Sequence, residues 1–272
     1  GENFVPEDYR HEEFDELKIQ GFAKLHFKEK LHSTDVTFDV FDAKMKIHHL
    51  RLEDFGGRLH FENSDLRVEN FRGTLGKSDF LINAGLTFGT DTLLKNRDNF
   101  ISLKSTKLDF DQLFIYKEPD SLYAASPQKH EEGFNIYKDP FPNLKVDIEI
   151  KDLNYHLYKM KNFEGSFRIQ PDHYIYVDTL SLNAAGGNIK MNGYFNGSNP
   201  NLIYFSPKLK ISGVDLDKLL VKFENFGQDY LVSENLHGKI SGDLWGKIHI
   251  HKDLVPIIDD SEIHLDFKVL SG

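Results

Sequence analysis

The stretch Leu103–Glu118, LKSTKLDFDQLFIYKE, returns without a gap as LKISGVDLDKLLVKFE at Leu209–Glu224, 106 residues later. Two shorter segments repeat 108 residues apart: Phe55–Phe61 returns as Phe163–Ile169, and Leu81–Leu86 returns as Ile189–Tyr194. Matches at nearly one spacing indicate a duplicated module, and duplicated modules of this length usually build elongated arrays. The repeat therefore favours a scaffold or conduit over a protein with a single catalytic pocket.

Within each copy, apolar and polar residues alternate with a period of two. Val36, Phe38 and Val40 alternate with Thr37, Asp39 and Phe41, which predicts that the first three share one face of a strand. Glycine, asparagine and aspartate separate successive runs, as expected of turns. The 23 Phe and 11 Tyr residues also suit a pleated sheet. The pattern predicts β-strands with one apolar and one hydrated face.

One segment, residues 214–226, has helical spacing instead. Its apolar residues fall at positions i, i+3, i+4 and i+7: Leu216, Leu219, Leu220 and Phe223. Asp215 or Asp217 is expected to cap the start of this helix, and Gly227 its end. Asp109–Tyr116 is a shorter version of it in the first copy. Each module is therefore predicted to contain about five strands followed by a short helix.

We expect an all-β fold: an elongated, strongly curved antiparallel sheet of repeated five-strand modules that forms a groove, with short helices between the modules. The chain begins with Gly and stops within an expected strand, which indicates an excised fragment. The expected divisions are residues 1–34 (end of a preceding unit or an entry strand), 35–118 (first module), 119–143 (polar loop containing prolines), 144–228 (second module with its terminal helix) and 229–272 (start of a truncated third module).

Composition narrows the range of functions. A net charge of −10 argues against nucleic acid and against anionic headgroups, both of which need clustered Lys and Arg. The absence of cysteine excludes disulfides, thiolate metal sites and cysteine nucleophiles. No apolar run approaches the roughly 18–20 residues that cross a bilayer as a helix.

The 13 His residues raise the question of a metal site. His249 and His251 share a strand face and, with Asp253 or Asp243, are candidate zinc ligands. A closed zinc site needs three or four ligands, and no motif in the sequence supplies them. We therefore expect these histidines to be exposed strand positions, and we expect no cofactor.

Carboxylates recur at matched positions, Asp109 and Asp111 in the first copy and Asp215 and Asp217 in the second. An acid pair of the glycosidase type needs two carboxyl groups facing each other across a cleft. Here each pair lies at an expected helix start, where capping and the helix dipole explain it. Because the common nucleophile, phosphate-loop and metalloprotease motifs are also missing, the chain is not expected to be an enzyme.

The segments Ile211–Gln228 and Ser233–Gly242 resemble the C-terminal region of AsmA-like proteins of Gram-negative bacteria. Asn70–Gly76 and the pattern near Leu180–Gly193 are similar to the same family. The resemblance implies an inner-membrane anchor and a periplasmic body related to bridge-like lipid-transfer proteins, whose β-groove units have five strands and a crossing segment. It also implies phospholipid transport between membranes or outer-membrane biogenesis, with possible envelope protein partners, and no catalytic residues.

The expected ligand is a phospholipid or another acyl lipid, bound to the apolar face. Strand parity alone selects its candidate lining: Phe38, Ile47, Phe61, Val68, Ile82, Ile148, Leu157, Ile169 and Ile189. The alternative from another class is a structural or adhesive β-sandwich module that binds protein or glycan, with its apolar faces buried against each other.

Overall fold

The computed structural model describes residues 13–28, 31–46, 50–88, 98–114, 135–137, 141–155, 158–218, 237–252, 254 and 256–270. The strands are β1 (Phe14–Phe27), β2 (Leu31–Met45), β3 (Arg51–Glu62), β4 (Asp65–Leu75), β5 (Ser78–Thr87), β6 (Asn99–Asp109), β7 (Leu144–Tyr155), β8 (Tyr158–Gln170), β9 (Tyr174–Ala184), β10 (Gly187–Asn196), β11 (Tyr204–Asp215), β12 (Lys239–Ile250) and β13 (Pro256–Leu270). A four-residue helix, α2 (Phe110–Leu113), follows β6.

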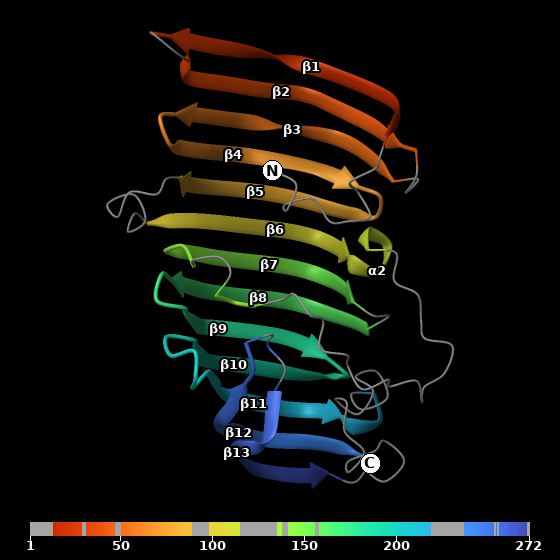
Figure 1. Ribbon diagram of the computed structural model, residues 1–272. Coiled ribbons are helices and arrows are strands. Elements are labelled where there is room, and N and C mark those ends of the chain that lie inside the picture. The colour runs from red at the N-terminus through yellow and green to blue at the C-terminus, as the bar shows by residue number, and fades with distance from the viewer. Residues whose placement is uncertain are drawn as a thin grey trace.

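These strands form one 13-stranded sheet in which each strand lies beside its neighbour in sequence (Figure 1). The prediction of a long, all-β, mostly antiparallel sheet with little helix is confirmed. The sheet is neither closed nor strongly curled, so the prediction of strong curvature is wrong. Alternation along a strand reports which face is apolar, whereas curvature depends on bulges and twist that alternation does not encode.

One pair of strands breaks the antiparallel pattern. β6 and β7 are parallel, with Asn99 beside Leu144 and Asp109 beside Asn154, and their arrows point the same way in Figure 1. A parallel pair requires a connection that returns from one end of the strands to the other.

Among the described residues, no helix has the length and hydropathy of a membrane span.

The duplicated segments occupy equivalent places in the sheet. β2–β6 and β7–β11 are each five strands followed by helical residues. The carboxylate of Asp109 accepts a hydrogen bond from the backbone amide of Gln112 at 3.1 Å, and that of Asp215 accepts one from the amide of Lys218 at 3.2 Å. The predicted cap at Asp215 is therefore present, and Asp109 makes the equivalent contact in the first copy. The predicted helix beyond Lys218 lies outside the described residues.

Candidate functional site

A row of apolar residues crosses the entire sheet on one face. Residues paired across neighbouring strands share a face, so the pairing register can be followed from strand to strand. We call this series the central row, and its face the apolar face. It takes one residue from each strand, β1 to β13: Ile19, Phe41, Phe55, Phe71, Ile82, Leu103, Ile148, Gly165, Leu180, Met191, Leu209, Leu244 and Leu265.

The register places the described members of the predicted lining on this apolar face. Ile82 and Ile148 belong to the central row itself. The others lie to either side of the row: Phe38, Phe61, Val68, Ile169 and Ile189. The remaining two candidates, Ile47 and Leu157, lie outside the described residues. The contact of this lining with lipid stays a prediction.

A bulge in β2 corrects one assignment made from alternation. Val40 was expected to share the face of Phe38, but Val40 pairs with Gln20 on the opposite face. Phe41 instead pairs with Ile19 and continues the apolar face, because the register shifts between Phe38 and Phe41. An extra residue in one strand reverses the alternation beyond it. The same effect explains why parity missed Phe41 as a lining residue.

Other members of the central row were missed for a similar reason. Phe71 follows Asn70, whose positive φ of 48° marks a register shift in β4. The rings of Phe41, Phe55 and Phe71 lie in sequence across three strands, with centroid distances of 6.2 Å and 5.8 Å. The signal available in the sequence was the aromatic residue in each of three successive strands.

The apolar face is open to solvent at both ends of the sheet. Leu17 and Ile19 in β1 are 54% and 56% exposed, and Leu265 and Val269 in β13 are 55% and 58% exposed. Large contiguous apolar surfaces are uncommon on soluble monomers and usually mark an interaction site. These two ends therefore point to an apolar ligand or partner.

The strand ends form the two long margins of the sheet. Each margin carries a buried cluster of apolar side chains on the apolar face. At one margin, Leu113 of α2 packs with Leu108 and Leu153, beside the ends of β6 and β7 (Figure 1). At the opposite margin, Ile136 packs with Phe195, near the end of β10. The described ends of the β6–β7 connection thus contact the apolar face at opposite margins, with the central row between them.

The opposite face, which we call the polar face, carries charged side chains. Across β6 and β7, the Lys104 ammonium lies 2.9 Å from the Glu149 carboxylate. In β8 and β9, the Arg168 guanidinium donates two hydrogen bonds to Asp178, at 2.6 and 2.7 Å. That pairing lowers the pKa of the Asp178 carboxyl. Such exposed pairs each stabilise the fold by little, but they keep this face hydrated.

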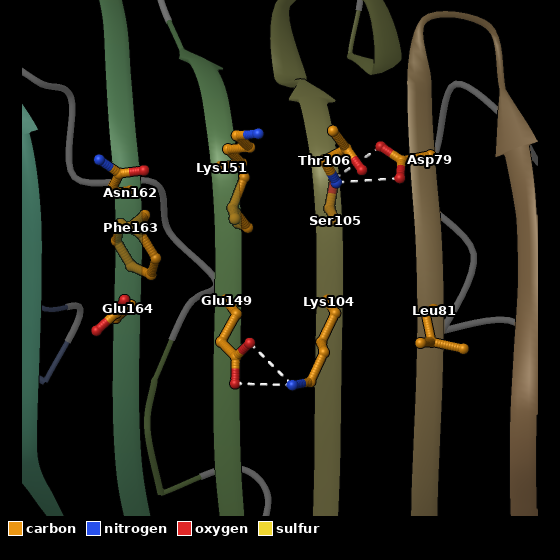
Figure 2. Close-up of a pocket in the computed structure, with 11 residues that line it drawn as sticks. Asp79, Leu81, Lys104, Ser105, Thr106, Glu149, Lys151, Asn162, Phe163 and Glu164 are labelled. Atoms are coloured by element: carbon orange, nitrogen blue, oxygen red, sulfur yellow. Dashed lines mark hydrogen bonds and ion pairs between the residues drawn. The ribbon is translucent and has the colours of Figure 1, made fainter.

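A hollow of about 430 Å³ is lined by residues of β5, β6, β7 and β8 (Figure 2). At its edge the Asp79 carboxylate accepts hydrogen bonds from the backbone amides of Thr106 and Lys107, at 3.0 and 2.6 Å. The two amides belong to an irregular part of β6, so the carboxylate satisfies donors that the neighbouring strand does not. Figure 2 shows Lys104 and Glu149 as an ion pair between β6 and β7, and the Ser105 hydroxyl donates a hydrogen bond to the Asp79 carboxylate at 3.3 Å.

Replacing Asp79 by Asn is expected to destabilise the fold at neutral pH by about 1–2 kcal/mol, because it removes a charge that two amides stabilise. Partial burial raises the pKa of Asp79, but the backbone amides of Thr106 and Lys107 and the hydroxyls of Thr106 and Ser105 together outweigh it, so the pKa lies below its ordinary value of 3.8. Since the folded pKa is lowered, the stabilisation is present above pH 3.8 and lost as the pH falls through the folded pKa.

Urea unfolding of both proteins from pH 7 down to pH 2 measures this difference. The two free energies of unfolding should converge at the acid end. A constant difference at every pH would show that the Asp79 charge is not the cause.

The candidate catalytic carboxylates are engaged in local structure. Asp109 caps α2 and also accepts a hydrogen bond from the side chain of Asn154, which bonds Asp111 as well. Asp217 pairs with His237. Within the described ranges, no group of three or more His, Asp or Glu side chains is placed to hold a metal ion. Of the zinc candidates, Asp253 lies outside the described residues.

Comparisons with protein-family models, characterised proteins and solved structures found no match to this chain. The resemblance to AsmA-like proteins therefore stays a prediction.

Proposed function

We propose that the apolar face binds the acyl chains of phospholipids, in a segment of an envelope protein that moves lipid between membranes. The central row carries this proposal, because it gives an apolar side chain or a glycine in every one of the 13 strands. The described strands all belong to one sheet, so none of them forms a second layer over that row.

The energy scale supports an acyl ligand. Exposing an acyl chain of about 16 carbons to water costs on the order of 12 kcal/mol, at roughly 0.8 kcal/mol per methylene. Twelve strand spacings of about 4.8 Å make the row roughly 58 Å long. An acyl chain spans about half of a 30 Å hydrocarbon core, so the row has room for several chains in succession.

The proposed path is the strip between the two buried clusters at the margins, with the lipid headgroups kept in water. The acyl chains would move from one residue of the central row to the next. This movement avoids most of the free energy needed to expose an acyl chain to water. No nucleotide or metal is needed for this step, and direction would come from elsewhere. By the resemblance to AsmA-like proteins, we propose that the segment lies in the periplasm, anchored to the inner membrane, and serves outer-membrane biogenesis.

The alternative, an adhesive β-sandwich, is not favoured by the arrangement of the described strands. A sandwich needs two facing sheets, whereas these strands form one.

Substituting Leu180 by Asp is expected to reduce bound phospholipid at least about tenfold, because it places a charge in the central row. The matched control is Thr179→Asp, which adds the same charge one residue away on the polar face, where Thr179 pairs with Ser166. Mass spectrometry of lipids extracted from protein purified from Gram-negative cells measures the effect, and thermal unfolding checks both variants. Equal lipid content in the two folded variants would contradict acyl binding at this face.

A further inference from the structure

On the polar face, three lysines form a cluster that costs stability. Lys190 in β10 lies directly opposite Lys210 in β11, and Lys208 is the next residue of β11 on the same face. Like charges directly opposite each other in a sheet are destabilising. Within the described part of the chain, none of the three takes part in an ion pair, although Asp243 lies opposite Lys210 in β12.

Aromatic side chains extend this cluster along the same two strands. Tyr194 and Tyr204 lie further along β10 and β11 on the polar face, with ring centroids 6.0 Å apart. In the flanking strands, Tyr176 lies 6.4 Å from Tyr194, and Lys247 lies 4.1 Å above the ring of Tyr204. Trp245, opposite Lys208, is 43% exposed. The strip thus passes from aromatic rings to the ammonium groups of the three lysines.

Amide groups line the strip between its two ends. Asn192 lies opposite Lys208, and the side chain of Asn196 donates hydrogen bonds to the hydroxyls of Tyr174 and Tyr204, at 2.7 and 3.1 Å. From Tyr204 to Lys210 the strip is about 20 Å long, at roughly 3.4 Å per residue. Rings, hydroxyls, amides and cations therefore lie along one line on an exposed sheet surface.

We propose that this strip binds an acidic glycan chain. A sugar ring has an apolar face that stacks on an aromatic ring, and its hydroxyls match the phenol and amide groups. Carboxylate or phosphate groups on the glycan would sit between Lys190, Lys208 and Lys210, where they would relieve the repulsion between the lysines. The strip is on the face opposite the central row, so this proposal is independent of lipid binding.

A glycan fits better than a single-stranded nucleic acid, which also binds to aromatic and basic surfaces. A nucleic acid carries a charge at every nucleotide and would meet a chain whose net charge is −10. A glycan with sparse acidic groups needs only the local cluster of three lysines.

Isothermal titration calorimetry with a short oligogalacturonate tests the proposal. Replacing Lys190 and Lys210 by Gln should weaken binding by about tenfold or more, and Tyr194→Leu should weaken it independently. The charge-matched control is the pair Lys18→Gln and Lys24→Gln on the polar face of β1, which should bind as the parent does. Removing the opposed lysines should leave the melting temperature unchanged or raise it, whereas a structural role would lower it.

Three results would overturn the proposal. A neutral maltooligosaccharide that binds as tightly as oligogalacturonate would show that the lysines recognise no acid. An oligothymidylate that binds more tightly would identify a nucleic-acid surface instead. Absence of oligogalacturonate binding to the parent protein would also reject it.

Discussion

A photoreactive benzophenone side chain at position 82 is expected to crosslink strongly to phospholipid, and the same group at position 81 is expected to give background labelling. Ile82 lies in the central row, between Phe71 and Leu103. Leu81 is the preceding residue of β5 and pairs with Lys104 and Arg72 on the polar face. The two residues have the same size and depth along the sheet and differ only in the face that they occupy.

Crosslinking in cells, followed by mass analysis of the lipid adduct, measures the labelling at each position. We expect the ratio of labelling at position 82 to that at position 81 to exceed about tenfold, because a bound acyl chain would be held against one face only. Similar labelling at positions 81 and 82 would reject acyl binding along the row. Labelling at 81 alone would place the lipid on the polar face.

Alternation was sufficient to predict the strands and most of the apolar face, because both depend on neighbours close in sequence. Ile82 and Ile148 were placed on one face by parity, and the register of β5, β6 and β7 joins them through Leu103. The cap at Asp215 was predictable for the same reason, since it contacts a residue only three positions away.

Features that depend on distant residues were not predictable in this way. The reversal between Val40 and Phe41 follows from a bulge, which the local pattern of apolar residues does not mark. The parallel pairing of β6 with β7 and the assembly of all strands into one sheet depend on which strands meet. The polar-face strip was also missed, because Lys190 and Lys210 become neighbours only once β10 and β11 pair.

The duplicated modules differ in backbone geometry at a pair of matched glycines. Gly57 in β3 corresponds to Gly165 in β8 at the repeat offset of 108 residues. Gly57 has a φ of +145°, and a Cβ atom there would lie 2.6 Å from the Cα atom of Phe71. At Gly165 the nearest atoms belong to the ring of Phe167, and its backbone is not in the left-handed region. A side chain can rotate away from an added methyl group, whereas paired backbone cannot.

Gly57→Ala is therefore expected to lower the free energy of unfolding by about 3 kcal/mol or more, through backbone strain and a clash with β4. Gly165→Ala should cost about 1 kcal/mol, the price of moving an aromatic ring. Urea unfolding of the two variants beside the parent measures both values. Equal losses would mean that the close contact between Gly57 and Phe71 does not constrain the sheet. A loss near 3 kcal/mol is a large part of the 5–15 kcal/mol that stabilises a typical domain, so the close approach of Gly57 to the backbone of Phe71 is expected to be a principal constraint on the pairing of β3 with β4.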